Sequence, residues 1–181
     1  MTSGVTATLA VPVSSHDHIR GRVDAPLTLV QYGDFQCPHC ALVFPVVLEI
    51  SDELKDSLAL AFRHFPLPDI HPFTQRTAEA AEAAASQGRF WEMARLLYEN
   101  YEGMDEEGLL RCARKAGLRS GQFRKEIASG IHAPRVRADY LGGVRSGVKG
   151  TPTFFINGRL YEGRQDSSSF VAELLRVSRA G

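Results

Sequence analysis

The pattern of apolar residues in the N-terminal part of the chain changes its period twice. Residues 27–32 (LTLVQY) form a short, β-prone apolar run that ends at Gly33, which is typical of a buried strand. From Pro38 to about Leu54 the apolar residues recur at helical spacing, and residues 58–65 (LALAFRHF) then alternate again and predict a second strand. The expected apolar face of the helix comprises Leu42, Val43, Val46, Val47, Ile50 and Leu54. Strand, helix and strand in this order predict a βαβ unit with parallel strands and a right-handed crossover.

Residues 72–147 have a different pattern, rich in Ala and charged residues and interrupted by glycines. Clusters of β-branched residues, which favour strands, are almost absent from this region. The periodicity predicts four or five helices, at roughly 73–87, 89–101, 105–116, 120–129 and 133–146.

Strand character returns with residues 153–156 (TFFI), which predict a hairpin together with the Asn157-Gly158 turn and residues 159–161. A final helix is expected from a cap within residues 167–169 to about Val177. Its inward-facing residues are expected to be Phe170, Val171, Leu174 and Leu175. The predicted order is therefore βαβ, a helical block, and ββα.

A chain of 181 residues is long enough to bury a hydrophobic core and suits a single folding unit. Its 21 basic and 21 acidic residues cancel, so charge gives no case for binding nucleic acid or an anionic membrane. No apolar stretch has the length of a transmembrane helix. Residues 6–13 are the one candidate for a secretory signal, but no Lys or Arg precedes them and they contain Pro12. A secretory signal needs a basic start and a longer apolar run. We therefore expect a cytoplasmic monomer, unless a leader has been removed.

Two of the three cysteines lie in a Cys-Pro-His-Cys motif between the first expected strand and its helix. A disulfide exchanger needs a thiolate that attacks and a second thiol, one helical turn away, that resolves the mixed disulfide. A helix N-terminus favours the anion of Cys37, and His39 adds to this when it is protonated or donates a hydrogen bond. The pattern predicts Cys37 as nucleophile and Cys40 as resolving thiol, in a pair that is a better oxidant than one with an apolar or Gly-containing dipeptide. The candidate catalytic residues are Cys37, Pro38, His39 and Cys40.

Two other interpretations of this motif are less favoured. Half of a zinc site would need two further ligands, and no second Cys or His pair follows at a suitable spacing. Two merely buried cysteines would not explain Pro38 and His39, which fill a core poorly. We therefore expect no metal and no cofactor beyond the redox-active Cys37–Cys40 disulfide.

Thr151-Pro152, directly before the predicted hairpin, is the second candidate site. In isolation such a Thr-Pro is usually a turn or edge-strand proline. Beside a redox βαβ unit it suggests a cis proline that faces the cysteines and leaves the Thr151 backbone free to pair with an extended substrate peptide.

Four segments carry a family resemblance: GRVDAPLTLVQYGDFQCPHC, FRHFPL, QGRFWEM and SGVKGTPTFFING. In this order they resemble the DsbA-like thioredoxin family, in its branch with the YGDFxCPxC signature. The resemblance implies an α/β thioredoxin fold, with βαβ and ββα halves in residues 1–66 and 148–181 and an all-helical insertion over residues 67–147.

The same resemblance implies roles for individual residues. Cys37 matches the nucleophile, Cys40 the resolving cysteine, Pro152 the cis proline and Thr151 the residue before it. It also implies that the partners are protein thiols or disulfides and a thiol redox partner.

One residue departs from the family pattern. Six positions before the nucleophile, where the family usually has a buried acid that relays protons to the inner cysteine, this chain has Gln31. Because an amide cannot accept that proton, we expect resolution through Cys40 to be slower or to use water. The loss of a buried negative charge should also favour the thiolates.

The remaining residues are expected to be structural. Cys112 falls on the apolar face of a predicted helix and should be a buried, inert thiol. His64 and His71 are expected to be structural or surface groups, while Asp34 and Phe35 shape the turn before the motif. Core packing explains the aromatic residues that recur at helical spacing, which are Phe90, Trp91, Tyr98 and Tyr101.

Three functions are compatible with these features. The leading hypothesis is a thiol–disulfide oxidoreductase, an enzyme whose direction of electron flow is unresolved. The alternative is a chaperone-like module in which the helical block and the groove beside Pro152 hold unfolded clients and redox activity is secondary. A small-molecule transferase with one thiol is disfavoured because it would not need Cys40.

Overall fold

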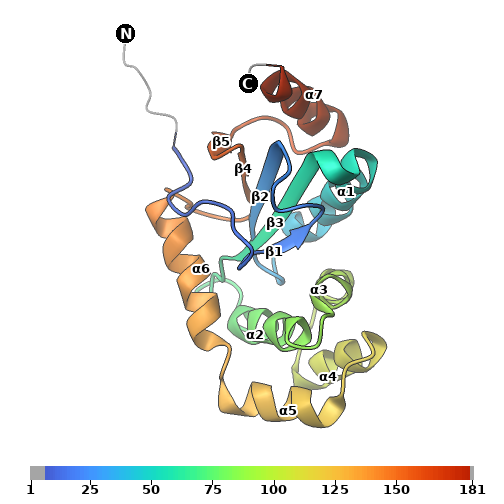
Figure 1. Ribbon diagram of the computed structural model, residues 1–181. Coiled ribbons are helices and arrows are strands. Elements are labelled where there is room, and N and C mark those ends of the chain that lie inside the picture. Colours follow the sequence, from blue (N-terminus) through green and yellow to red (C-terminus); the bar gives the residue numbers. More distant parts are fainter. Residues whose placement is uncertain (1–6, 180–181) are drawn as a thin grey trace.

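The computed structural model describes residues 7–179 and contains one mixed sheet. Its five strands lie in the order β1-β3-β2-β4-β5 (Figure 1). The strands are β1 (His18–Arg20), β2 (Leu27–Gly33), β3 (Leu58–His64), β4 (Thr153–Ile156) and β5 (Arg159–Tyr161). Strands β2 and β3 pair in parallel, as expected for a βαβ unit, and the other pairs are antiparallel.

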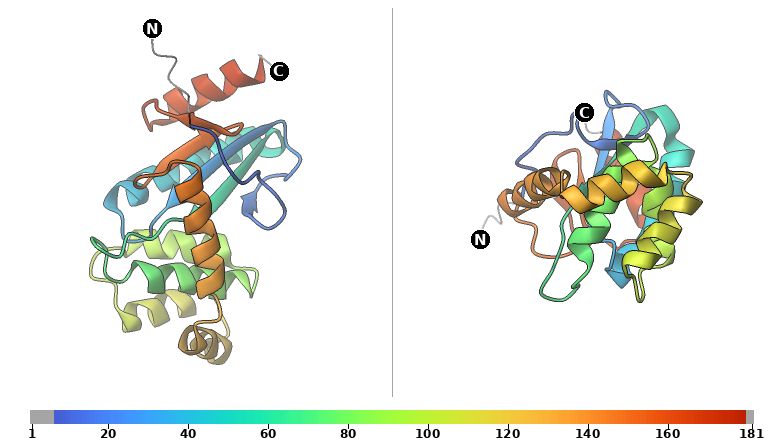
Figure 2. Two further views of the ribbon diagram at one scale, coloured as in Figure 1. Left: turned by 90° about the vertical axis from the view of Figure 1, so that its left-hand side faces the viewer. Right: turned by 90° about the horizontal axis from the view of Figure 1, so that it is seen from below.

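Helices cover the sheet and extend beyond one end of it (Figures 1 and 2). They are α1 (Pro38–Leu54), α2 (Thr74–Ala85), α3 (Phe90–Glu99), α4 (Glu106–Lys115), α5 (Ser120–Ser129), α6 (Ala133–Arg145) and α7 (Ser167–Ser178), with a short 3-10 helix, η1 (Lys55–Ser57). Helices α2 to α6 all come between β3 and β4. The predicted order of βαβ, helical block and ββα is therefore confirmed. None of the described helices is long and apolar enough to cross a bilayer.

The alternation of side chains along β2 gives the sheet two apolar faces. Leu27 and Leu29 point into the larger core, to which α1, α3 and α7 contribute. Val30 and Tyr32 point into a smaller core on the other face, against Phe65 and residues of α6 and of the segment before β1. Since both faces are covered, β2 is buried almost throughout and can position the loop that follows it.

The larger core continues from the sheet into the helical block. Leu29 of β2, Leu97 of α3 and Phe123 of α5 all belong to it. The boundaries expected for the insertion, residues 67–147, remain a prediction, because the core passes through both parts without a break.

Helix α1 has the predicted bounds but a narrower buried face. Pro38 stands in its first turn, and Val43, Val47 and Ile50 are buried. Leu42 was expected to face inward, but 76% of it is exposed. At about 100° per residue, position 42 lies roughly 200° around the helix from the buried Phe44 and so faces solvent.

The ends of the chain show three further differences. Strand β1 was not predicted, because three residues are too few for a periodic signal; it forms as Ile19 pairs with Ala61 at the edge of β3. In α7 the cap is Asp166 rather than a serine within residues 167–169, since its carboxylate accepts a hydrogen bond from the Ser169 N–H at 2.9 Å. Leu175, expected to face inward, is 45% exposed.

A buried ion pair holds the segment before β1 against the sheet. The Arg63 guanidinium of β3 donates to both carboxylate oxygens of Asp17, at 2.7 and 3.0 Å. It also donates to the carbonyl oxygens of Val11 and Pro12, at 2.8 and 3.0 Å. Because both side chains are 5% exposed or less, neither charge has an alternative partner in water.

Removal of Asp17 should therefore be costly. We expect Asp17→Ala to lower the free energy of unfolding by about 3–5 kcal/mol, since it leaves the Arg63 charge buried and uncompensated. Urea unfolding followed by circular dichroism measures this. The matched control is Asp24→Ala, which removes an exposed Arg22–Asp24 pair and should leave the free energy of unfolding almost unchanged. Equal losses in the two variants would contradict the role given to the buried pair.

Candidate active site

Cys37 occupies the N-cap position of α1, where the chain leaves the loop after β2. Its backbone is extended, and its N–H donates to the Asp34 carbonyl oxygen at 3.1 Å, which closes the loop as a tight turn. Its Sγ accepts a hydrogen bond from the Cys40 backbone N–H at 3.3 Å. The sulfur therefore takes the place that a Ser or Asp oxygen usually has at a helix N-terminus, where free N–H groups favour an anion.

The surroundings of Cys37 lower the pKa of its thiol to about 5. The largest cause is a hydrogen bond from the Cys40 thiol to the Cys37 thiolate. Burial opposes it, while the hydroxyl of Thr151 and the backbone N–H groups of Cys40 and His39 add to it. At neutral pH Cys37 is therefore a thiolate, the nucleophilic form of cysteine.

Cys40 lies one turn further along α1 and is fully buried. Burial is the largest cause that raises the pKa of its thiol well above the usual value, and the neighbouring Cys37 raises it further. The two sulfurs thus have opposite preferences at neutral pH, since one is charged and the other keeps its proton. Such an asymmetry is the one that thiol–disulfide exchange requires between an attacking and a resolving thiol.

Thr151 lies directly against Cys37, although the two residues are far apart in sequence, and Pro152 follows it. The Cys37 Sγ lies 3.4 Å from the Thr151 carbonyl oxygen. When the Cys37 thiol is protonated, it donates a hydrogen bond to this oxygen. The Thr151–Pro152 peptide bond is cis, and Pro152 is buried. Among the described residues the buried Thr151 Oγ1 has no other hydrogen-bond partner, so its hydroxyl can donate to the Cys37 thiolate. The two motifs singled out in the sequence therefore meet at one sulfur atom.

Pro38 and His39 are exposed. The ring of His39 makes no hydrogen bond to any residue between 7 and 179, and its effect on the Cys37 thiolate comes from its backbone N–H. His39 is thus placed at the mouth of the site, where an incoming partner can meet its ring.

Asp34 fixes the loop that carries Cys37, as expected, and His71 is part of this anchor. Asp34 Oδ1 accepts from the Gln36 N–H at 2.8 Å, and Oδ2 accepts from the Leu67 N–H at 3.0 Å. The Asp34 carboxylate is also paired with His71 Nδ1 at 2.8 Å. Sequence reasoning assigned a turn to Asp34 but left His71 as a structural or surface group, because 37 positions separate the two residues.

Tyr98 of α3 was explained in the sequence by core packing alone, yet it contributes a polar group beside Cys40. Its hydroxyl is buried and has no hydrogen-bond partner among the described residues. Burial raises the pKa of Tyr98 well above its usual value, and Cys40, Asp34 and Cys37 raise it further. Gln31 is buried as well, and within residues 7–179 its Nε2 has no partner.

Cys112 is not part of this site. It lies in α4, is buried, and its Sγ faces the Leu96 carbonyl oxygen of α3 at 3.7 Å. Burial raises the pKa of its thiol, so it stays protonated at neutral pH. This agrees with the inert thiol expected from the sequence.

Comparison of sequences gives one family match and several curated relatives. The family model described as thioredoxin matches residues 14–174. The Na⁺/H⁺ antiporter NhaA 3 of Salinispora tropica is 42% identical over 168 residues, which cover 92% of this chain and 26% of that protein. The Na⁺/H⁺ antiporter NhaA of Herminiimonas arsenicoxydans is 36% identical over 181 residues, 99% of this chain and 28% of that protein. The chain thus spans about a quarter of the length of the curated relatives that it matches.

Solved structures match over nearly the whole chain. BdbD from Bacillus subtilis superposes with a TM-score of 0.83 at 18% identity, covering 96% of this chain and 99% of BdbD. A thioredoxin-like oxidoreductase from Silicibacter pomeroyi gives 0.75 at 25% identity, with 93% and 95% covered. Wolbachia pipientis α-DsbA1 gives 0.79 at 19% identity, with 92% and 93% covered. The chain therefore belongs to the thioredoxin family, with the fold of its DsbA-like members.

Proposed function

We propose that the protein is a thiol–disulfide oxidoreductase that exchanges disulfides with protein thiols through a mixed disulfide at Cys37, resolved by Cys40. The observation that carries the proposal is the environment of the Cys37 sulfur. This atom caps α1, accepts from the Cys40 N–H at 3.3 Å and has a thiol pKa of about 5. The general activity also fits the DsbA-like fold.

In the reducing direction the Cys37 thiolate attacks one sulfur of a client disulfide. A Cys37–client mixed disulfide forms, and the other client sulfur leaves as a thiolate. Cys40 then loses its proton and attacks the Cys37 sulfur, which forms the Cys37–Cys40 disulfide and releases the second client thiolate. Two electrons pass to the client. The oxidising direction is the same sequence in reverse, and the potential of the redox partner decides which direction prevails.

The deprotonation of Cys40 is the demanding step of this sequence. Burial keeps the Cys40 proton in place, and Gln31 cannot accept it because an amide is not a base. The Cys37 thiolate itself becomes neutral when the mixed disulfide forms, which removes the neighbouring charge that raises the pKa of Cys40. Formation of the intermediate therefore makes the resolving thiol easier to ionise.

Thr151 and Pro152 are the proposed contact for the client backbone. Since the Thr151 carbonyl lies 3.4 Å from Cys37 Sγ, a peptide whose cysteine is bonded to Cys37 must run along this segment. Pairing of a client backbone with the backbone of such a segment gives affinity without sequence specificity. This suits an enzyme that acts on many protein thiols.

A second candidate function is the chaperone-like module, and a groove beside the site favours it. The groove has a volume of about 660 Å³ and is lined by the loop after β3, Gln75 of α2, the first two turns of α6 and Lys149. Its wall includes Leu67, Val136 and Tyr140, and Lys149 lies two positions before Thr151. If client holding is the primary activity, suppression of client aggregation will persist when both Cys37 and Cys40 are replaced by Ser.

Replacement of the nucleophile should abolish exchange. We expect Cys37→Ser to reduce the rate of insulin reduction with dithiothreitol to the uncatalysed level, because no thiolate remains at the N-cap. Cys40→Ser should instead accumulate mixed disulfides with client proteins, visible by mass spectrometry. The matched control is Cys112→Ser, which removes a buried thiol outside the site and should keep full activity. Unchanged turnover in Cys37→Ser would refute the proposal.

The pKa of Cys37 sets the pH dependence of its reactivity. The rate of iodoacetamide alkylation of the reduced protein should rise through a midpoint near pH 5 and reach a plateau below neutral pH. Cys40→Ala removes the strongest hydrogen bond to the thiolate, so this midpoint should move up by about 1–2 pH units. A midpoint near pH 8 to 9 in the parent protein, typical of a free cysteine at about 8.5, would contradict the assigned electrostatics.

A further inference from the structure

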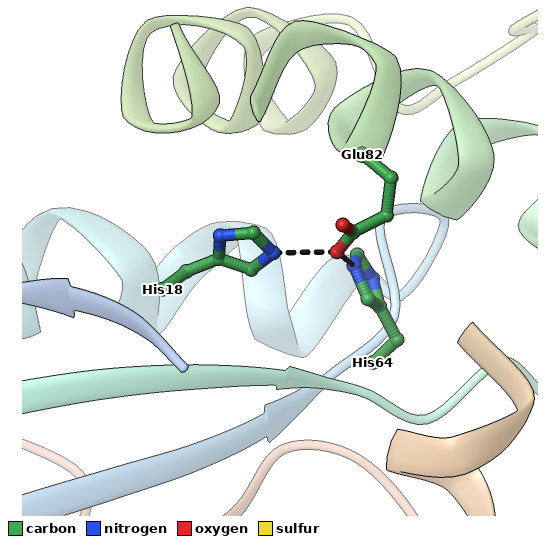
Figure 3. A group of neighbouring side chains, drawn as sticks. All are labelled: His18, His64 and Glu82. Carbon is green, nitrogen blue, oxygen red and sulfur yellow. Dashed lines mark hydrogen bonds and ion pairs between the residues drawn. The ribbon is translucent and has the colours of Figure 1, made fainter. Parts of the chain in front are cut away.

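Three titratable side chains meet outside the redox site, at the junction of the sheet with the helical block (Figure 3). His18 comes from β1, His64 from the end of β3 and Glu82 from α2. Glu82 Oε1 lies 2.5 Å from His18 Nε2 and 2.7 Å from His64 Nε2. All three potential ligand atoms lie within 4.8 Å of one another.

The cluster is enclosed by the protein. Side-chain exposure is 13% for His18, 1% for His64 and 8% for Glu82. The His18 ring stacks on Phe90 with centroids 3.7 Å apart, which fixes its plane. The slightly exposed His18 is the side from which water or an ion can enter.

The charge of Glu82 has no fixed cation to balance it. Within residues 7–179 its carboxylate pairs with the two imidazoles and with no Lys or Arg. A buried carboxylate requires a counter-charge, which can be one extra proton on the imidazoles or a bound cation. Two imidazole nitrogens and one carboxylate oxygen converge on one point, so both possibilities are geometrically open.

We propose that His18, His64 and Glu82 form a binding site for one divalent transition-metal ion, with Zn²⁺ the ion that best fits the donor set and water as the fourth ligand. Two His and one Glu with an open position are a known zinc ligand set, whereas Ca²⁺ and Mg²⁺ require mainly oxygen ligands. The ion replaces the hydrogen atoms that now lie between the nitrogens and Oε1. With metal–ligand distances of about 2.0–2.2 Å and tetrahedral angles, neighbouring ligand atoms lie roughly 3.4 Å apart. The present N···O contacts of 2.5 and 2.7 Å must therefore open by about 0.7–0.9 Å, through movement of the flexible Glu82 side chain.

The hydrogen bonds made by the other ring nitrogens of the two histidines also affect the affinity of the site for a metal. A metal at Nε2 leaves the proton of each neutral imidazole on Nδ1, and such protons usually have an acceptor. His64 Nδ1 is buried and without a partner in the described part of the chain. Loss of such an outer hydrogen bond typically weakens metal binding by about 10–100-fold. We therefore expect weaker binding than at a four-ligand structural zinc site.

The sequence predicted no metal, since no second Cys or His pair follows the Cys-Pro-His-Cys motif, and it did not bring these three residues together. Glu82 is 64 positions from His18 and 18 from His64, so no spacing motif connects them. Only the pairing of β1 with β3 and the position of α2 bring them together. A bound ion would link these three elements and stabilise the junction between sheet and helical block.

Zn²⁺ binding to the full chain tests the proposal. The protein is first oxidised, so that Cys37 and Cys40 form their disulfide and cannot bind the metal. Calorimetric titration should give one equivalent of Zn²⁺, and Zn²⁺ should raise the unfolding temperature. His18→Gln and Glu82→Gln should each lose the equivalent and the stabilisation. The matched control is His132→Gln. It breaks a pair in which His132 Nε2 lies 2.8 Å from Glu126 Oε2 and which contains only one imidazole, so this variant should bind Zn²⁺ as the parent protein does.

X-ray absorption of the parent protein with Zn²⁺ keeps the test independent of whether the variants fold. The expected spectrum has scattering from two imidazoles and no sulfur bound to the metal. Failure of the oxidised parent to bind Zn²⁺, binding that survives both His18→Gln and Glu82→Gln, or a bound metal without imidazole ligands would each overturn the proposal. In any of these cases the cluster holds a proton rather than a metal.

Discussion

The structure around the candidate active site depends on one interaction, the capping of α1 by a sulfur anion. A helix N-terminus has N–H groups without partners, and here the Cys37 Sγ meets one of them, from Cys40, at 3.3 Å. The βαβ unit makes this possible because the buried β2 ends immediately before the loop and α1 begins immediately after it. Asp34 then holds the loop closed through three hydrogen-bonding partners.

The difference between the two cysteines follows from the same geometry. Cys37 sits at the helix end and is stabilised as a thiolate, while Cys40 sits one turn inward, where burial keeps it protonated. At pH 7 a thiol with a raised pKa is neutral, as an ordinary thiol is, so only Cys37 changes the stability of the reduced form. Because the pKa of Cys37 is depressed, this stabilisation grows as the pH rises from about 5 toward the ordinary pKa of a free cysteine, about 8.5. At neutral pH the Cys37 thiolate therefore stabilises the dithiol relative to a pair whose nucleophile has an ordinary pKa.

Local signals in the sequence predicted the parts of the site that are local in the chain. The Cys-Pro-His-Cys motif placed Cys37 at a helix N-terminus, and the proline-containing turn before the hairpin identified Thr151. What the sequence could not supply were contacts that depend on tertiary structure. The pairing of Asp34 with His71 and the meeting of His18, His64 and Glu82 join segments that no periodic pattern relates.

The helices show a similar limit. Their bounds followed from periodicity and glycines to within a few residues, since both signals are local. Which apolar residues face the core did not follow in full, because Leu42 faces solvent, away from the buried side of α1, and Leu175 is left partly uncovered by the neighbouring elements. Strand β1 likewise exists only because β3 offers it an edge.

The most direct test of the central claim is the reduction potential of the Cys37–Cys40 pair, measured by equilibration with a glutathione redox buffer. Thioredoxin, whose nucleophile has a pKa of about 7, has a potential of about −270 mV. Since each pKa unit corresponds to about 1.4 kcal/mol, and therefore to about 30 mV, a stabilised Cys37 thiolate predicts a value tens of millivolts above that of thioredoxin. A potential equal to that of thioredoxin or below it would show that the Cys40 thiol and the helix end together do not stabilise the Cys37 thiolate.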